Sequence, residues 1–202
     1  MKAYSMKLYG PTSSPYVRKV RVAAAELGIG DRLSLVITGV SPVAPNRDLA
    51  AMNPGIKVPA LELDGGRFLY DSRIILRYLN EQAGGALYPA GDWEVQRKES
   101  LAEGLLDAAL LVRFETALRP AEKQWQEWIG GQSAKINSIL DAMEQEAASL
   151  TAIDAAAIGT GCALGYLDFR FPDWGWRNGR PGLAHWFENF NARPSMQSTP
   201  QE

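Results

Sequence analysis

Two adjacent serines, Ser13 and Ser14, stand where a strand pattern passes into a helix pattern. Residues 6–9 are short, alternating and apolar enough for a strand, and apolar residues from Val17 onward recur at the spacing of one helix face. Pro15 suits a first helical turn, because proline lacks a backbone N–H and an N–H at that position would have no intrahelical acceptor. The segment therefore predicts either an ordinary serine N-cap or a hydroxyl that donates to a thiolate, since a helix N-terminus favours anions.

Two later segments carry related chemistry. Lys57, Val58 and Pro59 stand at the start of a predicted strand, where a proline cannot donate to the ladder. If the peptide bond before this proline is cis, the Val58 backbone would face outward and could pair with an extended peptide. Asp71 and Ser72 stand at the entry of the next predicted helix, where a hydroxyl and backbone N–H groups can bind a carboxylate. Each segment alone is typical of an N-cap or an edge-strand proline, but together they favour a site for an anionic thiol peptide.

Composition excludes several other classes of function. The 202 residues carry a net charge of −2, which favours neither nucleic acid nor an anionic membrane as a partner. The local basic cluster, Arg18, Lys19 and Arg21, is predicted to be a solvated helix face. A single cysteine, Cys162, excludes an internal disulfide or a redox pair, and with one histidine, His185, the chain predicts no metal site.

The compartment follows from the same composition. The N-terminal residues lack the apolar core of a signal peptide, and the longest apolar run, 155–167, is too short to span a bilayer. We therefore predict a soluble, cytoplasmic protein with no membrane partner.

The order of the elements predicts two domains. Residues 6 to about 82 follow the order β-α-β-α-β-β-α, and the short first crossover makes the first two strands parallel. Residues 84–91 form a linker rich in glycine and alanine, and only helix patterns follow it. The prediction is an α/β domain over 6–83 and an all-α domain over 92–202.

One helix start in the second domain is explicit in the sequence. Thr151 precedes Asp154 by three residues, which predicts a capping box that fixes the start of the Ala/Gly-rich helix. Cys162 lies in the middle of this helix on an apolar face and is predicted to be core.

Five segments together resemble the glutathione S-transferase family, in order and at the expected separations. They are 13–20, 53–61, 70–72, the pair Thr151 and Asp154, and 192–195. Residues 162–170 further resemble the bacterial YibF-type homologues of that family. The resemblance covers essentially the whole chain and implies a thioredoxin-like N-terminal domain, a helical-bundle C-terminal domain, a homodimer and glutathione as co-substrate.

The resemblance also implies roles for individual residues toward glutathione. Val58, next to Pro59, would bind the cysteine of glutathione through its backbone. Asp71 and Ser72 would hold the γ-glutamyl end, and Lys57 would neutralise the glycyl carboxylate.

The activating hydroxyl is assigned to Ser14, with Ser13 and Tyr9 as alternatives. A free thiol has a pKa near 8.5, so that only a few per cent is thiolate at neutral pH and a donor is needed. Each of the three positions resembles the one used by some class of the family, and Ser14 is preferred over Ser13, with Tyr9 as the third candidate.

The expected reaction is transfer of the thiolate to a small, largely apolar electrophile, a detoxification chemistry. That substrate would lie between the domains, against Tyr16, Arg113 and Phe114. Glutathione-dependent reduction or dehalogenation is an alternative, although no cysteine occupies the positions of Ser13 and Ser14. A non-catalytic adaptor that keeps the same fold and site is the alternative from another class.

Overall fold

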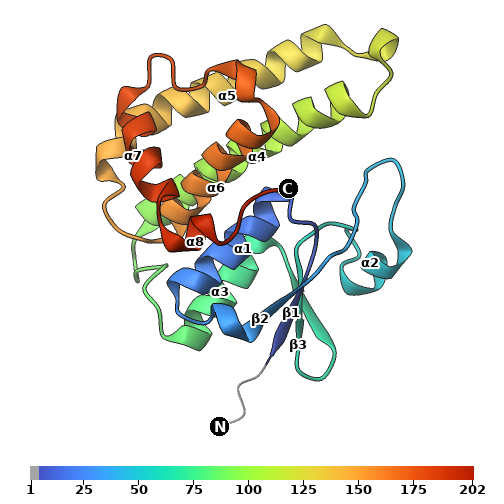
Figure 1. The fold of residues 1–202 in the computed structure, drawn as a ribbon, viewed down its shortest axis with the longest axis vertical. Coiled ribbons are helices and arrows are strands. Elements are labelled where there is room, and N and C mark those ends of the chain that lie inside the picture. The colour runs from blue at the N-terminus through green and yellow to red at the C-terminus, as the bar shows by residue number, and fades with distance from the viewer. Residues whose placement is uncertain (1–4) are drawn as a thin grey trace. The chain divides into compact units, whose positions relative to one another are not determined.

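The computed structural model describes residues 5–202 and divides into two compact units (Figure 1). Among the described residues, one unit comprises 5–90 together with Arg193–Glu202, and the other comprises Gly91–Ala192. The elements of the first unit are β1 (Met6–Tyr9), α1 (Pro15–Glu26), η1 (Gly30–Arg32), β2 (Leu33–Val36), α2 (Arg47–Met52), β3 (Ala60–Leu63), β4 (Arg67–Tyr70), α3 (Ser72–Ala83) and α8 (Pro194–Gln197).

The first unit is built on a four-stranded mixed sheet in the order β2-β1-β3-β4. β1 runs parallel to β2 and antiparallel to β3, with Leu8 opposite both Leu35 and Leu61. Leu8 and Leu61 are fully buried, and the alternation of strand side chains puts Lys7 and Glu62 on the other face. This confirms the predicted thioredoxin-like domain.

Helices α1 and α3 pack against each other on one side of this sheet (Figure 1). Their inward side chains, such as Val20 on α1 and Leu76 and Leu79 on α3, are completely buried. Burial of a large aliphatic side chain is worth about 1.5–3 kcal/mol, so this layer fixes both helix N-termini against the sheet.

The second unit contains only helices within its described residues. They are α4 (Trp93–Ala117), η2 (Ala121–Lys123), α5 (Gln126–Glu146), η3 (Ala147–Ser149), α6 (Ala155–Arg170), η4 (Pro172–Trp174) and α7 (Pro181–Asn191). Helix α6 is the core of this unit, because it contacts α4 and α7 and is buried from Ala155 to Leu167. Gly161 lets the ring of Phe190 lie directly against the α6 backbone. The predicted helical-bundle domain is confirmed.

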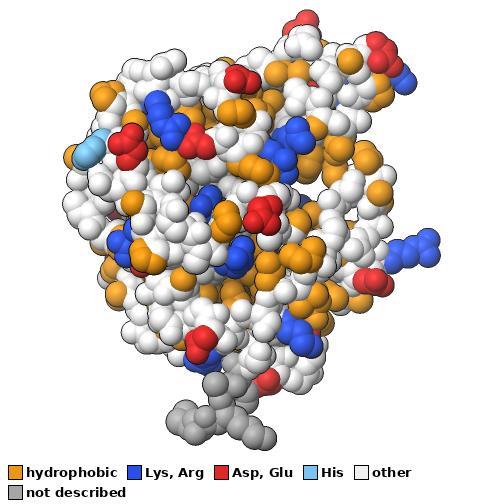
Figure 2. Space-filling model, in the orientation of Figure 1, with side chains coloured by type: hydrophobic (Ala, Val, Ile, Leu, Met, Phe, Trp, Pro, Cys, Tyr) orange, Lys and Arg blue, Asp and Glu red, His pale blue; other side chains and the backbone are white. Residues whose placement is uncertain are grey.

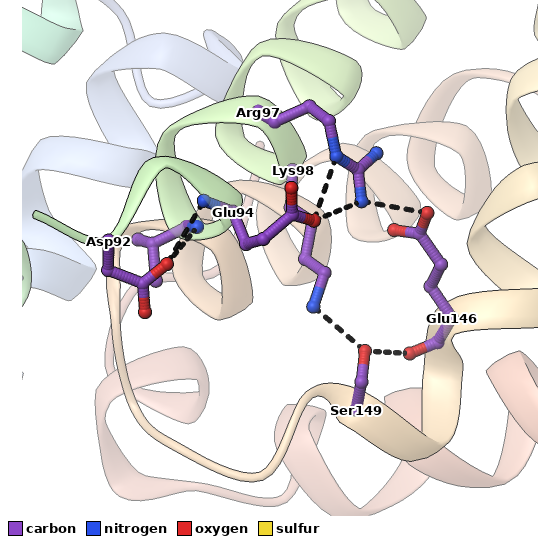
Figure 3. A network of polar contacts seen from close by, with 7 residues as sticks. Asp92, Glu94, Arg97, Lys98, Glu146 and Ser149 are labelled. Atoms are coloured by element: carbon purple, nitrogen blue, oxygen red, sulfur yellow. Dashed lines mark hydrogen bonds and ion pairs between the residues drawn. The ribbon is translucent and has the colours of Figure 1, made fainter.

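A polar network joins the start of α4 to the end of α5 (Figure 3). The Arg97 guanidinium donates to Glu94 in its own helix and to Glu146 of α5, both at 2.8 Å. Lys98 Nζ donates to Ser149 Oγ at 2.8 Å. Because these side chains are partly to largely exposed, each ion pair contributes little stability.

Residues 193–202 group with the first unit, whereas the sequence-based boundary assigns them to the helical domain. The Arg193 guanidinium pairs with Glu26 of α1 at 2.7 and 2.8 Å, and α8 contacts α1. Ionic contacts between residues 167 positions apart leave no periodic signal in a sequence, which explains the difference.

The predicted solvated face of basic residues on α1 is wrong. Lys19 is completely buried and Arg18 is only 7 % exposed. The Arg18 guanidinium donates to the carbonyl of Met196, and that of Arg21 donates to the carbonyl of Ser198. Residues 193–202 cover this face and supply acceptors for Arg18 Nη1 and Nη2, while Arg18 Nε is buried without a hydrogen-bond partner among the described residues.

The predicted capping box at Thr151 is also wrong in its details. Asp154 itself is the N-cap of α6, with an extended backbone, and its carboxylate accepts from Ala157 N at 2.9 Å. Thr151 is exposed and lies four residues before the first helical residue.

Replacement of Asp154 by Ala should therefore lower the free energy of unfolding by about 0.5–2 kcal/mol, because the N-cap acceptor is lost. Thr151→Ala is the matched control and should change it by less than about 0.5 kcal/mol, since this side chain is exposed. Urea unfolding followed by circular dichroism measures both variants. An equal loss in the two variants would contradict the assigned N-cap.

Candidate functional site

The turn before α1 presents a hydroxyl at a helix N-terminus. Ser14 is the N-cap of α1 and is 8 % exposed, and its Oγ accepts from Val17 N at 3.3 Å. Its backbone N–H donates to the Pro11 carbonyl at 3.1 Å. A hydroxyl that accepts one hydrogen bond still has its own proton to donate, so N-capping and donation to a ligand are compatible.

Gly10 brings this turn close to the Val58 segment. Its φ is +153°, and a Cβ at this position would clash with the Val17 side chain and lie 3.1 Å from Val58 Cβ. Only glycine permits this approach, because any side chain here would push the first turn of α1 away from Val58.

Asn53 holds the Val58 segment through a hydrogen bond, while the main-chain groups of Val58 itself are unpaired within the described part of the chain. The Val58–Pro59 peptide is cis, and Asn53 Nδ2 donates to the Lys57 carbonyl at 2.9 Å. Within residues 5–202, neither the N–H nor the C=O of Val58 forms a hydrogen bond. Unpaired main-chain groups beside a strand are available to an extended peptide.

The entry of α3 combines a carboxylate with a largely buried hydroxyl. Asp71 is the N-cap, at an unusual φ of +67°, and its carboxylate accepts from Arg73 N at 2.9 Å. The Arg73 guanidinium lowers the pKa of the Asp71 carboxyl, and the charge of Lys19 adds to this effect while burial opposes it. Ser72 is 4 % exposed at the first position of the helix. Asp71 is therefore a carboxylate at neutral pH.

Tyr9 directs its hydroxyl to a carboxylate of its own sheet. Its OH donates to Glu62 at 2.5 Å, and Lys7 Nζ donates to the same Glu62 oxygen at 3.2 Å. The hydrogen bond to Glu62, together with burial, raises the pKa of Tyr9. The proton that a thiolate would need is thus already engaged on Glu62.

The three predicted electrophile-site residues belong to different units. Tyr16 lies in the first turn of α1 and is half-buried. Arg113 and Phe114 lie on α4 of the other unit, where Phe114 is 37 % exposed. Burial raises the pKa of Tyr166, and the charges of Arg170 and Arg113 oppose that rise.

Sequence reasoning missed Gln201. Its Nε2 donates to the Ser13 carbonyl at 3.2 Å, across 188 positions of the chain. The separation, and the absence of any motif around Gln201, left no signal that could have found it.

Within residues 5–202, no group of three or more His, Cys, Asp or Glu side chains is placed to hold a metal ion. No helix in the same range is both long and apolar enough to cross a membrane.

On the face drawn in Figure 2, basic and acidic side chains are interspersed. Cys162 is fully buried in α6, as predicted for a core residue.

The chain is similar to known proteins of one family in both of its domains. Residues 13–82 match the glutathione S-transferase N-terminal domain, and residues 108–189 match the C-terminal domain of the same family. The uncharacterized GST-like protein YibF of Escherichia coli K12 is 35 % identical, over 96 % of this chain and 98 % of that protein. The chain belongs to the glutathione S-transferase family.

Two solved structures with bound glutathione are similar to this one. A glutathione transferase family member from Pseudomonas fluorescens Pf-5 is 46 % identical with a TM-score of 0.95, over 98 % of this chain and all of that chain. A glutathione S-transferase from Methylobacillus flagellatus KT is 33 % identical with a TM-score of 0.85, over the same shares of the two chains.

Proposed function

We propose that this protein binds glutathione and transfers its thiolate to a small, largely apolar electrophile. The observation that carries the proposal is that one unit places the turn before α1, which bears the Ser14 hydroxyl, close to the backbone N–H and C=O of Val58, which are unpaired within residues 5–202. The glutathione bound in two similar structures supports it.

Glutathione is an extended tripeptide with two carboxylates, one ammonium group and a thiol, and the unit offers a partner for each part. The Val58 N–H and C=O pair with the backbone of its cysteine. At the γ-glutamyl end, Ser72 and the N-terminal N–H groups of α3 bind the carboxylate, while Asp71 faces the ammonium group. Lys57, which is exposed, neutralises the glycyl carboxylate. Pro59 is buried and anchors this segment to β3.

Ser14 activates the thiol in this proposal. Its hydroxyl donates to the sulfur while its oxygen stays on Val17 N, and the α1 dipole adds positive potential. Together these effects lower the thiol pKa by about one to two units, each worth about 1.4 kcal/mol. The thiolate then forms a bond to an electrophilic carbon, whose leaving group departs with the electron pair.

Ser13 remains the alternative donor, being adjacent on the same turn. Tyr9 is the weaker alternative, because its proton is engaged on Glu62. Tyr16, Arg113 and Phe114 are proposed to contact the electrophile. A thiol co-substrate needs a reducing compartment, so we expect the activity, a detoxification reaction, in the cytoplasm.

A conjugation assay with a chromogenic aryl halide and wild-type protein tests the reaction itself. Turnover at a rate above the uncatalysed reaction supports the transferase. Glutathione binding without turnover of any aryl halide, epoxide or disulfide substrate would instead favour a non-catalytic adaptor. Turnover of disulfides alone would favour a reductase. Release of halide without a glutathione conjugate would favour a dehalogenase.

Ser14→Ala should raise the pKa of bound glutathione and lower kcat/KM at neutral pH roughly 5- to 10-fold, because one thiolate donor is lost. Activity should partly recover at high pH, where solvent ionises the thiol, while glutathione affinity changes little. Ser13→Ala is the matched control and should be milder. A wild-type pH–rate profile in Ser14→Ala, with loss in Ser13→Ala or Tyr9→Phe, would assign the role to the other hydroxyl.

Ser72→Ala should weaken glutathione binding roughly 10- to 100-fold, since a donor to a charged carboxylate is worth about 1.5–3 kcal/mol. Titration calorimetry measures the Kd. Ser34→Ala, an exposed hydroxyl on β2, is the control and should bind like wild type. Equal affinity of Ser72→Ala and wild type would mean that the γ-glutamyl end binds elsewhere.

We also propose a homodimer, as the family resemblance implies. Light scattering at micromolar concentration should then give twice the 22.1 kDa mass of the chain. A mass equal to one chain would contradict the dimer and leave the glutathione site of the single unit untouched.

A further inference from the structure

Residues 193–202, here called the tail, reach back to the turn that carries Ser13 and Ser14. We propose that the tail holds this turn in the orientation in which Ser14 can donate to the thiolate, and that Gln201 is the positioning residue. The inference rests on the proposed function and adds a residue outside the five segments that resemble the family.

The tail is anchored at its start by an ion pair with α1. Arg193 pairs with Glu26 through two nitrogens, at 2.7 and 2.8 Å, and Ser195 Oγ donates to the same carboxylate at 2.5 Å. The Arg193 guanidinium lowers the pKa of Glu26. Bidentate pairs of this kind have a fixed geometry, so the tail leaves α1 in a defined direction.

Arg18 guides the next residues of the tail. Its Nη2 donates to the Met196 carbonyl at 3.2 Å and its Nη1 to Gln201 Oε1, also at 3.2 Å. The same residue's backbone N–H donates to the Ser14 carbonyl at 3.0 Å. One buried arginine therefore links the tail to the first turn of α1.

Gln201 uses both ends of its side-chain amide. Its oxygen accepts from Arg18, which can only donate, and its nitrogen donates to the Ser13 carbonyl, which can only accept. The two partners thus fix which way the amide points. Thr12 adds a second, longer contact by donating to the Glu202 carbonyl at 3.4 Å.

The Ser13 carbonyl and the Ser14 N–H belong to one planar peptide group. The tail holds the carbonyl end through Gln201, and the Pro11 carbonyl accepts from the N–H end at 3.1 Å. Rotation of this plane would carry the Ser14 side chain with it. Because displacements of about 1 Å can cost a reaction roughly 100-fold, holding both ends bears on thiol activation.

Gln201→Met tests the inference, since it removes both hydrogen bonds at similar volume and adds no charge. The thiolate absorbance of bound glutathione, titrated against pH, should show a thiol pKa raised by about 0.5–1 unit, with roughly two- to fivefold lower kcat/KM at neutral pH. Glutathione Kd should change less than about threefold, because Gln201 is not a ligand contact.

Ser198→Ala is the matched control in the same tail, because its hydroxyl donates only to the Ser195 carbonyl within the tail. It should leave the thiol pKa unchanged. Gln201→Asn keeps a neutral amide that is one methylene too short to reach both partners. It should give a smaller shift, and it replaces Gln201→Met if that variant does not fold.

The outcomes separate the two proposals. A wild-type protein that does not lower the thiol pKa of glutathione overturns the proposed function and this inference with it. A lowered pKa in wild type that persists in Gln201→Met and Gln201→Asn overturns only the role of the tail. An equal shift in Ser198→Ala would also overturn it, because general weakening of the tail would then be the cause.

Discussion

The N-terminus of α1 must have its first N–H groups satisfied, and the first unit depends on how this is done. Ser14 satisfies one with its side chain, and Pro15 removes the need for another. Gly10 allows the turn to pass close to Val58 on the strand side. A helix end that is capped by a hydroxyl and backed by a sheet is rigid, polar and positive in potential, and these are the properties that an anionic sulfur requires.

The charges of α1 follow from the same constraint. Burial of a guanidinium or an ammonium group is costly unless hydrogen bonds replace its water. Arg18 donates such bonds to the Met196 carbonyl and to Gln201 Oε1, and Arg193 donates to the Glu26 carboxylate. The tail is thus required by the charges that it covers. Removing it would take away the acceptors of Arg18 and expose its guanidinium beside the turn that carries Ser14.

Three hydroxyls that look equivalent in the sequence differ in the structure by what they already bind. Tyr9 donates to Glu62, and that bond raises its pKa, which makes its proton less available. Ser14 accepts from Val17 and keeps its proton. Ser72 is buried at the entry of α3, beside a carboxylate that Arg73 keeps ionised. Each therefore suits a different part of an extended, charged thiol peptide.

The sequence by itself determined the elements and the positions of Ser14, Val58 and Asp71 at their ends. Hydrophobic period, proline and glycine act over a few residues, so that strand, turn and helix could be predicted locally, as could the helical second unit. Only the tertiary structure decided that Asp154 rather than Thr151 caps α6, because either residue type can cap a helix and the path of the preceding chain selects one. It also decided that Arg18 and Lys19 are buried and that Gln201 reaches Ser13. Those contacts join residues far apart in the chain, where no spacing rule links a cation to its acceptor and packing alone brings them together.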